Sequence, residues 1–194
     1  MQGSDALNIK GLYLRQSRCY LCAILAAYID IIPACLIYPM CRYEVETDGV
    51  LVAHASIYGN TAAVAHCIAE QLRSKGVEVK EIDLCRSNMS EAVSQAFRFG
   101  KMVLCAASYD GGVFPPMHEF LYKLGIKGYQ SRRVGVVENG TWAPTAGKTI
   151  CSMLQQMKNI EIVSPVLTIR STWKEDYQQN LNALVEGVIS EECM

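Results

Sequence analysis

The stretch Val50-Leu51-Val52-Ala53-His54-Ala55-Ser56-Ile57-Tyr58-Gly59-Asn60-Thr61 decides the fold of this chain. Its apolar half suits a buried strand, and the strand stops at a hydroxyl- and glycine-rich turn before a helix begins near Asn60. Backbone N–H groups at a helix start lack intrahelical partners, and the helix dipole favours an anion there. The loop has no Lys or Arg and matches neither common phosphate-loop pattern. It predicts a phosphate held by hydroxyls and N–H groups; the alternative is an ordinary turn.

Apolar runs and amphipathic stretches alternate along the rest of the chain. Five strands that alternate with five helices favour a parallel sheet covered on both faces. We therefore expect a three-layer α/β/α sandwich, and we take its five-stranded parallel sheet to have the order 2-1-3-4-5, in which the first, third and fourth strands are neighbours. The strands are expected at Gly49–Ala55, Val77–Leu84, Met102–Ala107, Arg133–Glu138 and Ile160–Ile169. The helices are expected at Asn60–Lys75, Ser90–Phe97, Pro116–Leu124, Ala146–Lys158 and Lys174–Ser190.

Composition argues against a nucleic-acid-binding protein and against a disulfide-rich one. The chain has 194 residues, 51% of them hydrophobic, and a formal net charge of −1. That charge gives no field favouring nucleic acid or an anionic membrane. The 9 cysteines are odd in number and scattered through apolar segments, which does not fit a disulfide framework and indicates a reducing, cytoplasmic setting. Cys105 falls inside an expected buried strand, where a thiol behaves as a small hydrophobe.

Residues 1–47 differ from residues 48–194, which we take as the main domain. The first part is an apolar, Cys-rich appendage, and its run Cys19–Met40 is apolar enough to suggest a membrane span or signal anchor. Asp30 and Pro33 interrupt the run, which argues against spanning. A zinc site can be drawn on Cys19, Cys22, Cys35 and Cys41. Structural zinc sites more often have two close cysteine pairs, and here only Cys19 and Cys22 form one.

Three loops follow the first, third and fourth expected strands. They are Ser56–Thr61, Ser108–Pro116 and Glu138–Thr145. In the expected strand order all three lie at one carboxyl edge, where doubly wound sheets bind ligands. Tyr109 and Trp142 are candidates to stack on a flat ring; the alternative for each is a partly buried aromatic at a loop base. For Glu138, at the strand end, a solvated or capping role is preferred to catalysis.

The segments SIYGNT (56–61), SYDGGVFPPM (108–117) and ENGTWAPTAGK (138–148) resemble flavodoxins. The resemblance is strongest to the flavodoxin-like domain of flavodiiron proteins (A-type flavoproteins), and it covers about residues 49–190. It implies a flavodoxin-like fold and the cofactor FMN. By motif position, the first loop would hold the phosphate and the other two would flank the isoalloxazine. The implied cofactor-binding residues are Ser56, Ile57, Tyr58, Gly59, Asn60, Thr61, Ser108, Tyr109, Asp110, Gly111, Gly112, Val113, Asn139, Gly140, Thr141, Trp142 and Ala143.

The sequence departs from that family in two ways. Its second loop has Ala106 and Ala107 where the family usually has Ser and Pro, and Asp110 where it has Asn. A carboxylate near the flavin disfavours the anionic reduced form by repulsion. The metallo-β-lactamase-like diiron domain, with its HxExDH motif, is not in this sequence, which has 3 histidines in all. His66 and His118 are expected to be surface or cap residues, and no metal ligand or catalytic residue is assigned.

The resemblance leads to an FMN-binding electron-transfer module of an oxidoreductase system, unable to do diiron chemistry alone. Its partners would be an electron donor such as rubredoxin or a reductase, and an acceptor such as a diiron domain or another protein. One alternative is an NAD(P)H-dependent flavin reductase of quinones or small molecules. Another is a degenerate flavodoxin-like domain that binds a partner without FMN. A phosphoacceptor receiver is disfavoured, because acidic residues are missing at positions 53–56.

Overall fold

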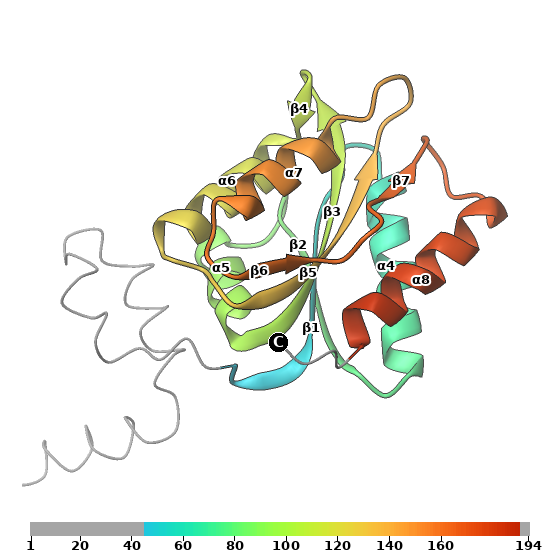
Figure 1. The fold of residues 1–194 in the computed structure, drawn as a ribbon. Coiled ribbons are helices and arrows are strands. Elements are labelled where there is room, and N and C mark those ends of the chain that lie inside the picture. Colours follow the sequence, from blue (N-terminus) through green and yellow to red (C-terminus); the bar gives the residue numbers. More distant parts are fainter. Residues whose placement is uncertain (1–44, 191–194) are drawn as a thin grey trace, which may run out of the picture.

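The structure is a computed structural model that describes residues 45–190 as a sheet between two layers of helices (Figure 1). The expectations for Cys19–Met40, including the zinc and membrane alternatives, lie outside the described residues. Within the described part, no helix is long and apolar enough to cross a membrane. The strands are β1 (Thr47–Ala55), β2 (Glu78–Asp83), β3 (Phe99–Tyr109), β4 (Gly112–Val113), β5 (Arg132–Asn139), β6 (Ile160–Ile162) and β7 (Leu167–Ile169). The helices are α4 (Asn60–Ser74), α5 (Met89–Arg98), α6 (Pro115–Ile126), α7 (Ala146–Gln155), the 3-10 helix η1 (Glu175–Tyr177) and α8 (Gln178–Ile189).

The main sheet has the order β2-β1-β3-β5-β6, and these strands pair in parallel. Counted without the two-residue β4, this is the expected order 2-1-3-4-5, which is confirmed. The three central strands are long and their middle residues are buried, and β5 has a buried residue at every position, as parallel strands covered on both faces require.

The last strand differs from the expectation of one continuous element at Ile160–Ile169. It is divided into β6, which pairs with the start of β5, and β7, which pairs with its end. Pro165 lies between them and has no N–H to donate to a ladder. The additional strand β4 forms an antiparallel hairpin with the end of β3. Its turn is the dipeptide Asp110-Gly111, and both residues have positive φ, 46° and 72°, as a type I′ hairpin turn requires.

The helices cover the two faces unequally. Helices α5, α6 and α7 pack on one face around Leu51, Met102, Leu104 and Phe120, and α4 and α8 pack on the other. Cys105 is fully buried in the second core, as expected. All parallel strands run toward the same edge, so the loops that follow β1, β3 and β5 meet there (Figure 1).

Candidate functional site

The first loop, Ser56–Thr61, is a tight turn at the start of α4. The N–H of Gly59 donates to Ser56 Oγ at 3.0 Å, and the Gly59 carbonyl accepts from Ala63 N at 2.9 Å. Gly59 has φ 90°, a left-handed conformation that glycine adopts without steric cost. The N-cap residue of this helix is Gly59, which has no side chain to cap it. The N–H groups of its first turn therefore remain available at the loop, beside the Ser56 hydroxyl.

The second and third loops are tied to one another. Ser108 Oγ accepts hydrogen bonds from the backbone N–H groups of Thr145 (3.0 Å) and Ala146 (3.2 Å). In return, Thr145 Oγ1 donates to the carbonyl of Gly112 at 2.9 Å. A Cβ atom on Gly140 would lie 2.9 Å from Ser108 Oγ and from Pro144 Cα, so glycine alone fits there without a shift. We call these contacts the loop staple; they fix the spacing of the two loops.

Glu138 and Asn139, at the end of β5, are both buried. Glu138 Oε2 accepts from Gly147 N in the first turn of α7, and Oε1 accepts from Thr168 Oγ1, both at 2.7 Å. Its capping role is thus the observed one, and a solvated role is wrong. The Asn139 side chain donates to the Ser171 carbonyl at 2.9 Å and accepts from Ser171 N at 3.1 Å. Asn139 therefore anchors the third loop to the segment after β7.

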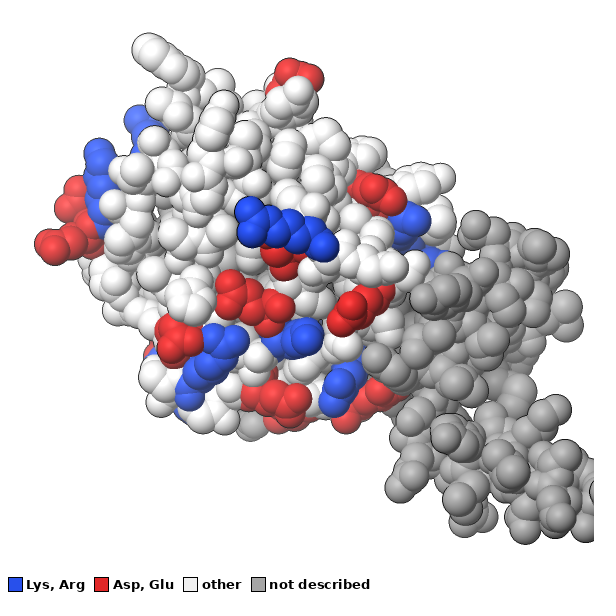
Figure 2. Space-filling view, turned by 180° about the vertical axis from the view of Figure 1, so that it is seen from behind, with Lys and Arg blue, Asp and Glu red and all other residues white. Residues whose placement is uncertain are grey.

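The aromatic side chains at this edge are exposed. Trp142 is 95% exposed and Tyr58 is 91% exposed. Trp142 is therefore not a partly buried aromatic at a loop base. Tyr109 is 45% exposed and its ring meets Phe114 edge-on, with 5.8 Å between the centroids. Figure 2 shows acidic and basic side chains interleaved over the lower part of one face, whereas its upper edge is nearly free of them.

The remaining predicted positions surround these groups. The residues of the first loop beyond Ser56 and Gly59 lie in the exposed turn or, as for Thr61, at the buried start of α4. Asp110 and Gly111 form the exposed tip of the β3–β4 hairpin, and Val113 is buried behind it. Thr141 and Ala143 are exposed beside Trp142. The structure thus brings all three predicted loops to one edge.

Sequence reasoning missed three residues that shape this edge: Thr145, Thr168 and Ser171. Each forms a hydrogen bond with a residue far away in the sequence, so no local sequence pattern predicts its role. Thr145 precedes α7, and a hydroxyl residue at that position is a typical signal for a helix start. Its side chain makes no capping hydrogen bond to its own helix.

Histidine and cysteine side chains are common metal ligands. His66 and His118 are exposed, as expected. His54 is buried in β1, with Nε2 3.7 Å from Glu81 Oε1. Cys85 lies behind the first loop, with its thiol 3.8 Å from the Ser56 carbonyl, and burial raises the pKa of that thiol. Across residues 45–190, no three His, Cys, Asp or Glu side chains are grouped so as to hold a metal ion.

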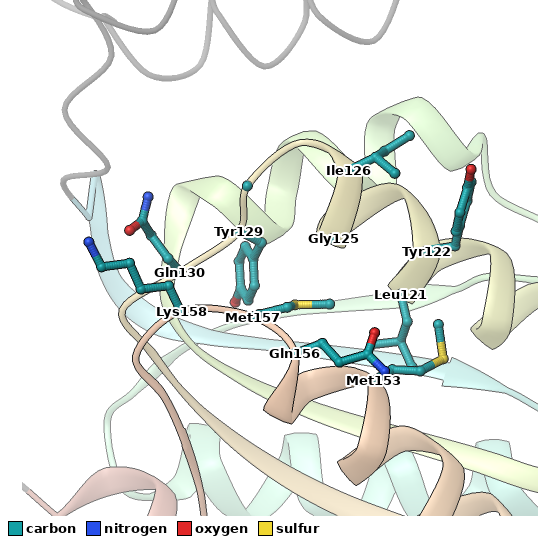
Figure 3. A pocket seen from close by; sticks show the side chains of 11 residues that line it. Leu121, Tyr122, Gly125, Ile126, Tyr129, Gln130, Met153, Gln156, Met157 and Lys158 are labelled. Atoms are coloured by element: carbon teal, nitrogen blue, oxygen red, sulfur yellow. The ribbon is translucent and has the colours of Figure 1, made fainter. Parts of the chain in front are cut away.

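Two cavities open away from the loop staple. One, of about 520 Å³, lies between the end of β2 and the start of α6 and is lined by Cys85, Val113 and His118 among others. The other, of about 390 Å³, lies between α6 and α7 (Figure 3). Val113 is the one predicted cofactor residue in these two linings. Neither cavity is therefore the predicted site.

Fold and edge together define a flavodoxin-like α/β protein. The sequence matches the flavodoxin family over residues 52–183, and the chain belongs to that family. The cofactor predicted from the sequence, FMN, is confirmed as the cofactor of this family.

Solved structures give the same fold. The rubredoxin oxygen:oxidoreductase of Desulfovibrio gigas superposes with a TM-score of 0.72 at 16% identity, over 79% of this chain and 38% of that one. An archaeal flavodoxin gives 0.64 at 20% identity, over 73% of this chain and 96% of that one. The flavodiiron protein of Giardia intestinalis gives 0.64 at 18% identity, over 75% of this chain and 35% of that one. The predicted resemblance to flavodoxin domains of the flavodiiron type is confirmed.

This chain is shorter than several of the proteins it matches. A curated, uncharacterized protein of Methanocaldococcus jannaschii is 24% identical over 128 residues, which are 66% of this chain and 32% of the relative. The chain thus spans about a third of that relative, and 38% of the Desulfovibrio gigas oxidoreductase.

We expect Ser108→Ala to loosen the third loop. The substitution removes the acceptor for two backbone N–H groups, and a part-buried donor without a partner costs about 1–3 kcal/mol. Hydrogen exchange should accelerate in residues 140–146 while the strands β1 and β3 keep their protection. Ser152→Ala, at an exposed position of α7, is the matched control and should leave exchange unchanged. Equal protection in both variants would show that the staple does not hold the loop.

We also expect His54 to weaken the fold in acid. Burial lowers the pKa of His54 below its ordinary value of 6.5, against the opposing charges of Asp83 and Glu81. Below pH 6.5 the unfolded chain therefore takes up this proton before the folded one, and the free energy of unfolding falls. His54→Gln should reduce that fall, by at most about 1.4 kcal/mol per pH unit for one proton.

Denaturant titrations at several pH values measure the effect. The control is His66→Gln, which removes an exposed imidazole 3.3 Å from the same Glu81 carboxylate. If the two variants show the same pH dependence as the parent chain, burial of His54 is not linked to stability.

Proposed function

We propose that this chain binds FMN at the three-loop edge and serves as an electron-transfer module in the cytoplasm. The observation that carries the proposal is the loop staple. Ser108 and Thr145 lock the second and third loops together at the edge, where Tyr109 and Trp142 stay exposed. This arrangement offers a preformed place for a flat ring, beside an uncapped helix start suited to a phosphate. Bound FMN would supply the one- and two-electron chemistry.

The residues of this chain divide the binding task by loop. Ser56 and the first N–H groups of α4 would donate hydrogen bonds to the phosphate, with Tyr58 and Thr61 adding hydroxyls. Ser108–Val113 and Asn139–Ala143 would flank the isoalloxazine, with Tyr109 and Trp142 as stacking rings. No side chain at this edge is assigned to move a proton, since the chain's part is to bind, orient and set the potential.

The exchange of electrons needs partners outside this chain. We infer an electron donor of the rubredoxin or reductase kind and an acceptor that carries a metal centre or another redox group, a diiron domain being the acceptor that the flavodiiron resemblance favours. The exposed position of Trp142 and Tyr58 supports this, because a ring held between such loops stays close to solvent and to a docked partner.

The test is the visible spectrum of the full chain before and after addition of FMN. Flavin bands that co-purify, or that shift and saturate near one equivalent, are expected. Subsequent oxidation of NADH or NADPH by the loaded protein alone would identify the flavin reductase instead of the electron carrier. Absence of binding at a large excess of FMN would overturn the proposal in favour of a partner-binding domain.

Trp142→Ala should weaken FMN binding. Aromatic stacking contributes about 0.5–1.5 kcal/mol beyond burial of area, which corresponds to a loss of about two- to tenfold in affinity. The measurement is a fluorescence titration of FMN with the full chain. Tyr122→Ala, which removes a ring that is 58% exposed on α6, should bind as the parent chain does. An unchanged affinity in Trp142→Ala would remove the third loop from the proposed site.

Asp110→Asn should raise the reduction potential of the bound flavin by tens of millivolts. The hairpin tip carries this carboxylate, and a nearby negative charge disfavours adding electrons to the ring. Spectroelectrochemical titration at two salt concentrations is the readout, since the effect of an exposed charge shrinks as salt screens it. The control is Asp176→Asn in η1. Equal potentials for the parent and Asp110→Asn would place the carboxylate away from the flavin.

A further inference from the structure

An apolar groove runs between α6 and α7, on the face of the sheet opposite α4 and α8. We define the α6/α7 groove by Leu121, Tyr122, Gly125, Ile126, Met153 and Met157, which line the cavity of about 390 Å³. Figure 3 shows Met157 reaching into the space beneath Gly125, with Tyr129 standing at one end. Gln130, Gln156 and Lys158 supply the polar rim.

The outer wall of this groove is exposed to an unusual degree for large apolar side chains. Tyr122 and Ile126 are each 58% exposed. They are four residues apart on α6, so they lie on one face, and both project from the outer side of the helix in Figure 3. A Cβ on Gly125 would come 3.7 Å from the end of Met157, so the bare glycine leaves the groove open there. Such a groove suits an apolar helix or segment, and methionine adapts to the shape of what binds.

The chain enters the described domain beside this groove. The N–H of Glu46 donates to the Arg98 carbonyl at 3.1 Å. Val45 packs over Gly100, where an added Cβ would meet its Cγ1 at 3.0 Å. Phe97, one residue before Arg98, meets Tyr129 of the groove edge-on, with 5.4 Å between the ring centroids. The chain therefore enters the domain next to Phe97–Gly100, and Phe97 also contacts Tyr129 at one end of the groove.

We propose that the apolar run Cys19–Met40 of this same chain docks in the α6/α7 groove. Residues 41–44 separate the run from the entry point, and extended chain covers about 3.3–3.6 Å per residue, which suffices to reach the adjoining groove. The single charged residue of the run is Asp30, and its sign is opposite to that of Lys158 at the rim.

Covalent linkage favours this occupant over a second copy of the chain. A segment tethered by a few residues is present at the groove at an effective concentration of the millimolar order. An equal groove on another molecule competes at the much lower concentration of the protein in solution. Burial of the run also removes apolar surface that is costly to expose to water.

The test uses the four cysteines that lie in or next to the run, at positions 19, 22, 35 and 41. Ile126→Cys in the full chain provides a thiol on the groove, and a short bis-maleimide joins thiols that lie close together. The matched control is Gln179→Cys, an exposed position on α8 at the opposite face of the sheet. Tyr122→Cys is a second groove variant in case Ile126→Cys folds poorly. After the cross-linked monomer and dimer are separated, peptide mass spectrometry of each fraction identifies the cross-links within one chain and between two chains.

Cross-links from position 126 or 122 to Cys19, Cys22, Cys35 or Cys41 within one chain, at least several-fold above those from position 179, are expected. Equal yields at both faces, or no intrachain cross-link, would overturn the proposal. Cross-links found only between two chains would assign the groove to a second copy. Co-sedimentation of the full chain with lipid vesicles, accompanied by loss of intrachain cross-links, would assign the run to a membrane.

Discussion

Parallel pairing of β1, β3 and β5 is the constraint on which the rest of the structure depends. Because these strands run in one direction, the chain leaves each of them at the same edge of the sheet. Each return passes through a helix on one face or the other, and those helices form the two cores. Three loops that are far apart in the sequence become neighbours in this way, before any of their own side chains interact.

Two helices begin at this edge, and their first turns are used differently. At α7, the backbone N–H groups of Thr145, Ala146 and Gly147 are accepted by Ser108 and Glu138. The start of α7 therefore serves to hold the protein together. At α4 the N-cap residue is Gly59, which has no side chain to cap the helix, so the N–H groups of the first turn remain available to a ligand at the loop. Protein side chains therefore occupy the positive end of the α7 dipole, whereas the positive end of the α4 dipole can still attract an anion.

The sequence predicts the strands and helices, because their apolar patterns are local. It does not predict hydrogen bonds between residues that only the fold brings together. Apolar runs and helical spacing predicted the alternation of strands and helices, and the resemblance to flavodoxins implied the strand order that brings SIYGNT, SYDGGV and NGTWA to one edge. The break at Pro165 was missed because the flanking residues are as apolar as a continuous strand. The pairing of Asn139 with Ser171, 32 residues apart, was missed because only the fold brings the two together. The dipeptide Asp110-Gly111 is a local hairpin signal that the sequence does carry.

If FMN binds as proposed, charge would also orient it at this edge. Among the predicted loop residues 56–61, 108–113 and 139–143, Asp110 is the one charged side chain. A phosphate dianion is repelled by the hairpin tip that bears Asp110 and attracted by the uncapped start of α4. The ring, which carries no charge when oxidised, meets no such penalty between the second and third loops. Shape and electrostatics thus favour the same orientation, and they do so through N–H and hydroxyl groups. Because the predicted loop residues include no Lys or Arg, binding of the phosphate at this edge would rest on the geometry of N–H and hydroxyl hydrogen bonds.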